Sequence, residues 1–285
     1  MSVRAAVARE QRLHDEVWRR ARRREAARGA SIAAGRALVL ALALGGWAVV
    51  AGRFGERTYI GDPAGVARAF WGLVASGRLW PNLVQTVGEV LSGYAIGAAF
   101  GIVVAVVVAF EETVQRVLRP FLIAAYSVPK IALAPLFVMW FGLGVAPKIV
   151  LVVLFVFFVV FMNTAAGLYQ VNPQLVDVVR VMGARRTDVV WKIALPSTVP
   201  YLITGLRIAI PEALVGAVIG EFIAANRGLG YLVNEAANEL NVSVTMAAIV
   251  ALLLIVVAMD IILGAVERRL LRWRPAQGAP IGVRE

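Results

Sequence analysis

Charged residues interrupt several apolar stretches of this sequence, and the chemistry of four of them needs an explanation. Lys130 lies well inside one stretch, and Arg207, Glu212 and Glu221 interrupt another. A charge that faces lipid costs a few kcal/mol or more, so we expect these side chains to face the protein interior. Two interpretations stay open. In the first, the charges line a translocation path, and the cations attract an anionic solute. In the second, Lys130 pairs with Glu212 and holds two helices together. For Arg207 the simpler alternative is a side chain that reaches toward the membrane surface.

The sequence offers little for enzyme chemistry. It has no cysteine and one histidine, His14, which lies in an arginine-rich tail. Disulfides, thiolate catalysis and Cys-based metal sites are therefore excluded, and a single histidine does not make a zinc site. No GxxxxGK[ST] phosphate loop occurs, so the chain does not hydrolyse nucleotides by that mechanism. We expect no catalytic residue, no metal and no cofactor.

Long apolar stretches must position the four charges. Of the 285 residues, 60% are hydrophobic and 16% are charged, and the mean hydropathy is +0.77. This is more apolar than a soluble core needs, so lipid is the expected solvent. Crossing a bilayer core takes about 20 helical residues. Six stretches have that length or nearly so: about 33–52, 87–110, 120–141, 149–168, 199–223 and 244–266.

These stretches predict an all-α polytopic membrane protein with six transmembrane helices. The membrane domain covers 31–266, between a basic tail (1–30) and a C-terminal tail (267–285). No alternating barrel pattern appears, and a lone strand in lipid would leave backbone groups unpaired.

Basic residues are distributed unevenly between the two sets of loops and tails. The segments 1–36, 111–119, 169–198 and 267–285 hold 21 of them, whereas 53–84, 143–148 and 224–243 hold 6. The positive-inside rule places the first set, with both termini, in the cytoplasm. The net charge of +11 then favours anchoring on the anionic inner leaflet of a bacterial plasma membrane rather than binding of nucleic acid.

Glycines recur at four-residue spacing in two of the stretches. Gly93, Gly97 and Gly101 form one series, and Gly216 and Gly220 form another. Such ridges let helix backbones approach closely. They indicate either packing inside one subunit, which we favour, or a contact between subunits.

Two further segments suggest moving parts. Pro129 and Pro135 either shape a gate or only interrupt the third stretch. Near the predicted outer face, a turn at Gly228 and Gly230 precedes a short amphipathic helix within 226–241. This helix either contacts another protein or closes the outer mouth.

The loop at about 169–198 is polar enough to lie outside the bilayer, yet it is patterned. Four apolar residues at helical spacing form a stripe: Leu175, Val178, Val179 and Met182. Gly183 then breaks the helix, Thr187 caps a second helix over about 188–194, and Pro196 ends it. An exposed apolar stripe predicts docking on another protein.

The spacing inside this loop resembles the "EAA" loop of ABC importer permeases, which reads Glu-Ala-Ala, three residues, Gly, nine residues, Ile-x-Leu-Pro. Here Asp177-Val178-Val179 is followed at those spacings by Gly183 and by Ile193-x-Leu195-Pro196. Three stretches resemble the nitrate/sulfonate/taurine group of these permeases: 127–144, 204–210 and 220–233. The resemblance covers about 82–266.

This resemblance implies a type I importer fold and a set of partners. They are a second copy of the chain, two copies of a cytoplasmic ATPase, and an extracytoplasmic binding protein that delivers a small anion such as a sulfonate, taurine or nitrate. The first half of the loop would be the coupling helix on the ATPase, where Asp177 pairs with a basic residue. The residues implied in coupling are Asp177, Val178, Val179, Met182, Gly183, Ala184, Arg185, Ile193, Leu195 and Pro196.

An ion-coupled secondary carrier is the alternative, because such carriers also place charges and broken helices at the membrane midplane. A membrane-embedded enzyme is a third class, but the apolar stretches show no paired-carboxylate motif. Transport that stops without an ATPase, rather than without an ion gradient, separates the first two.

Overall fold

The computed structural model describes residues 30–52 and 61–271, and within them every regular element is a helix. The chain divides into two compact units, residues 1–65 and 66–285. The first contains the apolar helix Ala30–Gly52, which is long enough to cross a bilayer core. The predicted basic tail, with His14, lies outside the described residues apart from Ala30, as does the C-terminal tail beyond residue 271.

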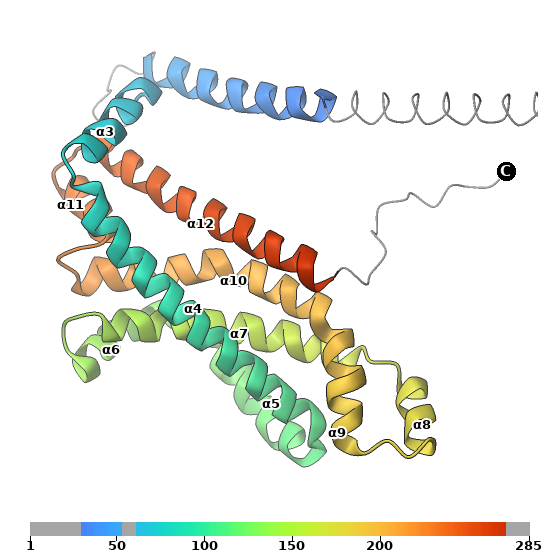
Figure 1. Ribbon diagram of the computed structural model, residues 1–285. Coiled ribbons are helices and arrows are strands. Elements are labelled where there is room, and N and C mark those ends of the chain that lie inside the picture. Colours follow the sequence, from blue (N-terminus) through green and yellow to red (C-terminus); the bar gives the residue numbers. More distant parts are fainter. Residues whose placement is uncertain (1–29, 53–60, 272–285) are drawn as a thin grey trace, which may run out of the picture. The chain divides into compact units, whose positions relative to one another are not determined.

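The second unit is a bundle of long helices joined by short ones (Figure 1). Within residues 30–52 and 61–271, five helices are long and apolar enough to span a membrane, and a bent pair makes a sixth if it is counted as one span. The predicted all-α fold with six spans is confirmed. The elements are α3 (Pro63–Ala75), α4 (Leu79–Phe110), α5 (Glu112–Ser127), η1 (Lys130–Leu133), α6 (Ala134–Phe141), α7 (Ala146–Tyr169), α8 (Pro173–Val181), α9 (Arg186–Val189), η2 (Val190–Ala194), α10 (Leu195–Ala224), α11 (Leu229–Asn238) and α12 (Val242–Leu270).

Helix α7 is the centre of the core, where it packs against α4 and α10. Apolar residues lie on nearly every side of α7, as expected of a helix without a water-facing surface. Eight buried residues from the three helices form the core cluster: Val90, Ala98, Val152, Val156, Val160, Ala209, Ala213 and Ala217.

The glycine ridges fit against α7 within the same chain. A Cβ atom on Gly97 would lie 2.8 Å from the carbonyl oxygen of Val153, and one on Gly216 would lie 3.0 Å from the Cα of Val152. No side chain fits at these distances without a shift of the neighbouring backbone. The interpretation of the ridges as packing inside one subunit is confirmed.

The third predicted stretch, 120–141, is interrupted at Pro129, as its prolines indicated. Its direction changes by 84° between Thr113–Ser127 and Lys130–Phe141. Val128 precedes a proline and is extended, with φ −66° and ψ 130°, because the Pro129 ring disfavours the helical conformation of the preceding residue. A 3₁₀ turn, η1, then leads into α6.

The predicted end of the second loop helix is wrong. Helix α9 begins at Arg186, continues through the π-helical turn η2 and runs without a break into α10. In η2 the N–H of Leu195 donates to the carbonyl of Val190, five residues back. Pro196 therefore lies inside a continuous helical segment, directly after the π-helical turn.

Candidate functional site

The loop between α7 and α10 is built by local capping. The Asn172 side chain accepts a hydrogen bond from the N–H of Gln174, at 2.9 Å, and starts α8. Gly183 has φ +89°, a left-handed conformation that ends the helix and that residues with a Cβ rarely adopt. Asp188, rather than Thr187, then caps α9, because its carboxylate accepts from the N–H of Arg185 at 3.1 Å.

The apolar stripe of this loop is exposed. Met182 is 80% exposed and Val181 is 88% exposed, and Leu175 and Val178 are about half exposed. Asp177 is exposed on the same helix. Figure 1 shows α8 and α9 at the end of α10 that lies away from α11. Nothing in the described residues covers this surface, so the predicted docking stripe is available to a partner.

The other residues of the predicted coupling set are less uniform. Val179, Ala184, Ile193 and Leu195 are half-buried, so they support the loop rather than present a surface. Arg185 and Pro196 are exposed. A cavity of about 260 Å³ lies beside α8. Asp177 and Arg180 of α8 and Val189 of α9 form part of its lining.

Lys130 lies at the break between α5 and α6, among aromatic rings. Its Nζ is 4.7 Å from the ring centre of Tyr126, 5.4 Å from that of Phe158 and 5.7 Å from that of Phe155. Rings hold a cation by their quadrupole. The expected Lys130–Glu212 pair is wrong, because the ion pairs of the described residues do not join them; Glu212 is half-buried on α10.

Arg207 ties α10 to α12. Its Nε lies 2.9 Å from Asp260, and its Nη2 lies 2.9 Å from Glu267. The guanidinium fork suits two carboxylates at once. Arg207 therefore has an ionic role within the subunit, which the sequence pattern did not predict.

Glu221 is buried and joins three helices at the other end of α10. Its Oε1 accepts a hydrogen bond from the hydroxyl of Thr86 on α4, at 2.6 Å, and its Oε2 accepts from the N–H of Gly230 on α11. Only 1% of the Glu221 residue surface is exposed. On the outer side of α11, the Glu235 carboxylate raises the pKa of the Tyr231 hydroxyl that donates to it.

A second buried ion pair, between Lys148 of α7 and Glu89 of α4, was missed by sequence reasoning. Lys148 was counted with an outer loop because the apolar run begins one residue later. Both side chains are buried, and the Gln85 amide donates to Oε1 of Glu89 at 2.6 Å. The signal was available: one charge of each sign stands at the edge of an apolar helix.

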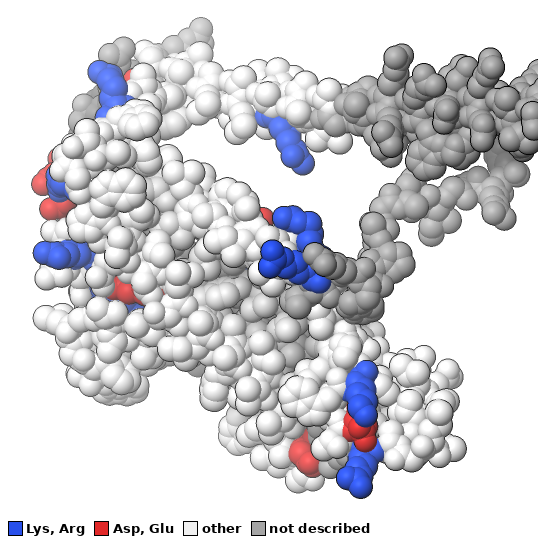
Figure 2. Space-filling view, viewed as in Figure 1, with Lys and Arg blue, Asp and Glu red and all other residues white. Residues whose placement is uncertain are grey.

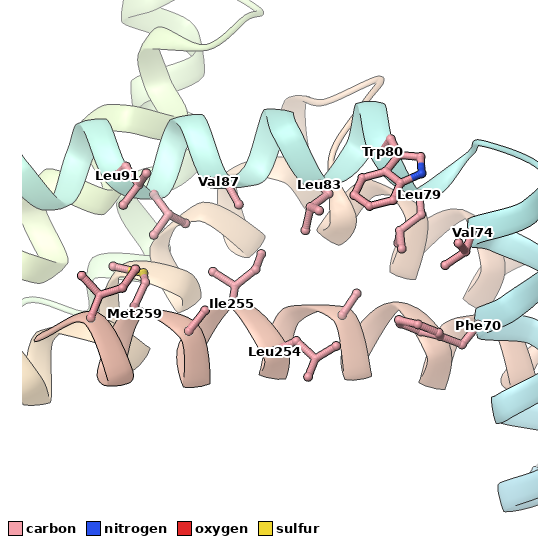
Figure 3. Close-up of a pocket in the computed structure, with 14 residues that line it drawn as sticks. Phe70, Val74, Leu79, Trp80, Leu83, Val87, Leu91, Leu254, Ile255 and Met259 are labelled. Carbon is pink, nitrogen blue, oxygen red and sulfur yellow. The ribbon is translucent and has the colours of Figure 1, made fainter. Parts of the chain in front are cut away.

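A large apolar cavity of the second unit does not belong to this charged site. It is a groove of about 480 Å³ between α4 and α12, and Figure 3 shows Leu83, Val87 and Leu91 facing Leu254 and Met259 across it. Its walls are aliphatic and aromatic. A groove of this kind offers a polar solute almost no hydrogen bonds, so it is not the candidate solute site.

Charged side chains are scarce along the bundle. In the face shown in Figure 2 they gather toward the ends of the helices, and uncharged side chains cover the length between. Among the described residues there is no group of three or more His, Asp or Glu placed to hold a metal ion. The arrangement suits a membrane component with a docking loop and a few buried charges.

Comparison with known proteins gives the family. Residues 97–272 match the model of the "Binding-protein-dependent transport system inner membrane component" family. The formylaminopyrimidine transport permease protein ThiX of Halalkalibacterium halodurans is 32% identical over 231 residues, which cover 81% of this chain and 92% of that protein. The taurine transport system permease protein TauC of Escherichia coli is 34% identical over 195 residues, covering 68% and 71%.

A solved structure gives the same fold. A chain of the methionine ABC transporter MetNI, in inward facing conformations, matches with a TM-score of 0.61 and 19% identity, covering 67% of this chain and 95% of that one. The present chain belongs to the family of inner-membrane components of binding-protein-dependent transport systems. It is a membrane-spanning ABC importer permease, a transport subunit rather than an ion-coupled carrier.

Proposed function

We propose that this permease receives its energy from a separate cytoplasmic ATPase that docks on α8 and on the turn around Gly183. The observation that carries the proposal is the exposed apolar face of α8, which includes Val178 and Met182. An apolar surface on a polar loop is costly unless a partner covers it. Asp177, exposed on the same helix, is placed to pair with a basic residue of the ATPase and fix the register of the contact.

The assembly that follows has two copies of this chain, two ATPase subunits and an extracytoplasmic binding protein. ATP hydrolysis belongs to the partner, because this sequence contains no phosphate-binding loop. The excess of basic residues in four segments, 21 against 6, supports cytoplasmic termini and a cytoplasmic α8. The printed names of the relatives, which are transport permease proteins, support the same assembly.

Co-purification tests the docking surface. The tagged chain and its Met182→Asp variant are extracted from native membranes in mild detergent, and the proteins that accompany each are identified. Gln174→Asp, also exposed on α8, is the matched control for an added charge. We expect a P-loop ATPase with the wild type and the control but not with Met182→Asp. Equal retention by all three would show that α8 is not the docking surface.

We further propose that the solute is a small anion, such as a sulfonate, taurine or nitrate. Two relatives are named for aliphatic sulfonates and for taurine. Lys130 supports the proposal, because rings rather than a carboxylate surround its ammonium group among the described residues. Arg207 lends less support than its charge suggests, since Asp260 and Glu267 neutralise it.

Uptake by the complete transporter tests this proposal. Labelled taurine, ethanesulfonate and nitrate are compared with riboflavin, which is larger and heteroaromatic. We expect uptake of at least one anion, a slower rate in Lys130→Gln and recovery in Lys130→Arg, which keeps the charge. Uptake of riboflavin alone, or unchanged anion uptake in a folded Lys130→Gln variant, would contradict the proposal.

A further inference from the structure

The start of α11 is held by side chains from other helices. In most helices the first N–H groups are capped locally. Here three consecutive N–H groups, those of residues 228–230, donate to side chains of α4 and α10. Their acceptors are Asn82 Oδ1 at 2.8 Å, Thr86 Oγ1 at 2.8 Å and Glu221 Oε2.

The backbone of this segment is shaped around the Glu221 carboxylate. A Cβ atom on Gly228 would lie 2.3 Å from the carboxylate carbon, and one on Gly230 would lie 2.7 Å from Oε2. Gly228 also has φ +134°, which other residues rarely adopt. The carboxylate thus occupies a cradle that only glycines permit, and the Thr86 hydroxyl bridges it to α4.

The ion pair between Glu89 and Lys148 lies beside this cradle and ties α4 to α7. Gly220 leaves the space for it, because a Cβ there would lie 2.8 Å from the Cγ of Lys148. In the described part of the chain, Oε2 of Glu89 has no hydrogen-bond partner. The pair fixes α4, which carries Thr86, against α7.

The segment between α10 and α11 is also one wall of a cavity. The cavity has a volume of about 460 Å³, and its lining includes Gln85, Lys148, the loop 143–145 and residues 223–227. Its walls are partly polar, unlike those of the groove between α4 and α12. Movement of the start of α11 would change the access to this cavity.

The opposite end of α10 connects directly to the docking loop. The chain is helical from Arg186 to Ala224, through α9, η2 and α10. Glu221 therefore stands near one end of a continuous helical segment, and the turn around Gly183 precedes the other end. The segment bends between α10 and α9 (Figure 1), and it contains the π-helical turn η2 and two prolines, Pro200 and Pro211. A continuous element that reaches both sites is a physical route for coupling between them.

We propose that Glu221 and Thr86 form a latch that holds the start of α11 against α4 and α10, and that this latch opens in each transport cycle. Glu221 is then a positioning residue of the outer gate, which α11 forms. The inference rests on the proposed function in one respect, since the docked ATPase supplies the movement of α10. The closed latch itself rests only on the contacts above.

Spin labels measure the latch directly, because the chain has no cysteine of its own. Labels are placed on Val84→Cys of α4 and Asn238→Cys of α11, both exposed, and the distance between them is measured with the chain in lipid nanodiscs. We expect one distance for the wild type. Glu221→Gln and Thr86→Val should each add a second, longer distance, whereas Glu239→Gln, an exposed carboxylate at the end of α11, should add none. Thermal unfolding confirms that each variant is folded.

The same labels in the complex with the ATPase test the cycle. Trapping with ATP and vanadate should add the longer distance in the wild type. If the complex hydrolyses ATP but the distance stays single, the latch does not open and the proposal is wrong, although the docking proposal stands. If no ATPase binds, the docking proposal fails, and the chain alone still decides the latch. A distance that is identical in folded wild type, Glu221→Gln and Thr86→Val would overturn it.

Discussion

The ion pair between Glu89 and Lys148 makes a quantitative prediction about stability. Their side chains are 1% and 4% exposed, so neither charge is solvated by water once its partner is removed. Removing one partner of a buried pair costs about 3–5 kcal/mol, because the remaining charge is buried alone. Replacing both by uncharged groups of similar size is often nearly neutral. We expect Lys148→Met and Glu89→Gln each to destabilise strongly, and the double variant to be less destabilised than either.

A double-mutant cycle measures this coupling. The free energy of unfolding of the four proteins is determined by SDS titration in mixed micelles, where reversibility is checked by refolding. The expected interaction between the two substitutions is at least about 2 kcal/mol, within the range for residues in one ionic network. Helix content from circular dichroism controls for variants that are already unfolded.

Additive effects would refute the reasoning. If the cost of the double variant equalled the sum of the single costs, the two charges would not interact in the folded protein. Small effects of both single variants would mean that water reaches the pair. In either case the attachment of α4 to α7 at this point would need another explanation.

Three further predictions use the same unfolding assay or the co-purification assay. Gly97→Ala should cost about 1–3 kcal/mol, since its Cβ would lie 2.8 Å from a backbone oxygen of α7. Gly88→Ala on the same helix has open space around it and should leave stability unchanged or raise it by up to about 1 kcal/mol, because alanine favours a helix interior over glycine. Equal effects would contradict the helix contact. A double-mutant cycle of Arg207→Met and Asp260→Asn should show an interaction free energy below about 1 kcal/mol, because both side chains are about half exposed. An interaction as large as that of Glu89 and Lys148 would mean that another surface buries the pair. Gly183→Ala should strain the turn after α8 by about 1–2 kcal/mol, because this residue has φ +89°, and it should weaken retention of the ATPase. Gly77→Ala, at φ +75° in a different loop, is the control and should leave retention unchanged.

The helices and the docking loop were predictable because their signals are local. A run of apolar residues marks a span whatever it packs against. The α8 stripe follows from helical spacing, and the turn follows from one glycine. The break in the third stretch was predictable as well, because Pro129 itself indicates an interruption. The end of the second loop helix was not, because the π-helical turn η2 lets the helix continue past Pro196.

The pairing of the buried charges was not predictable in the same way. Arg207 forms ion pairs with Asp260 and Glu267, and Lys130 lies among aromatic rings rather than beside Glu212. Lys148 looked like a loop residue until α7 was seen to begin before it. Apart from Tyr126, which is close to Lys130 in the sequence, each partner lies on a different helix.

The sequence by itself determined that this protein is a helical membrane protein, which loops carry its basic charge, and which loop carries the apolar stripe proposed for docking. These properties depend on hydropathy, composition and spacing, and a helix satisfies its own backbone within one segment. Only the tertiary structure decided which charges neutralise each other and that Glu221 holds the start of α11. Those contacts depend on how closely α4, α7 and α10 pack, because a hydrogen bond forms over about 3 Å in space and not over a fixed distance in sequence.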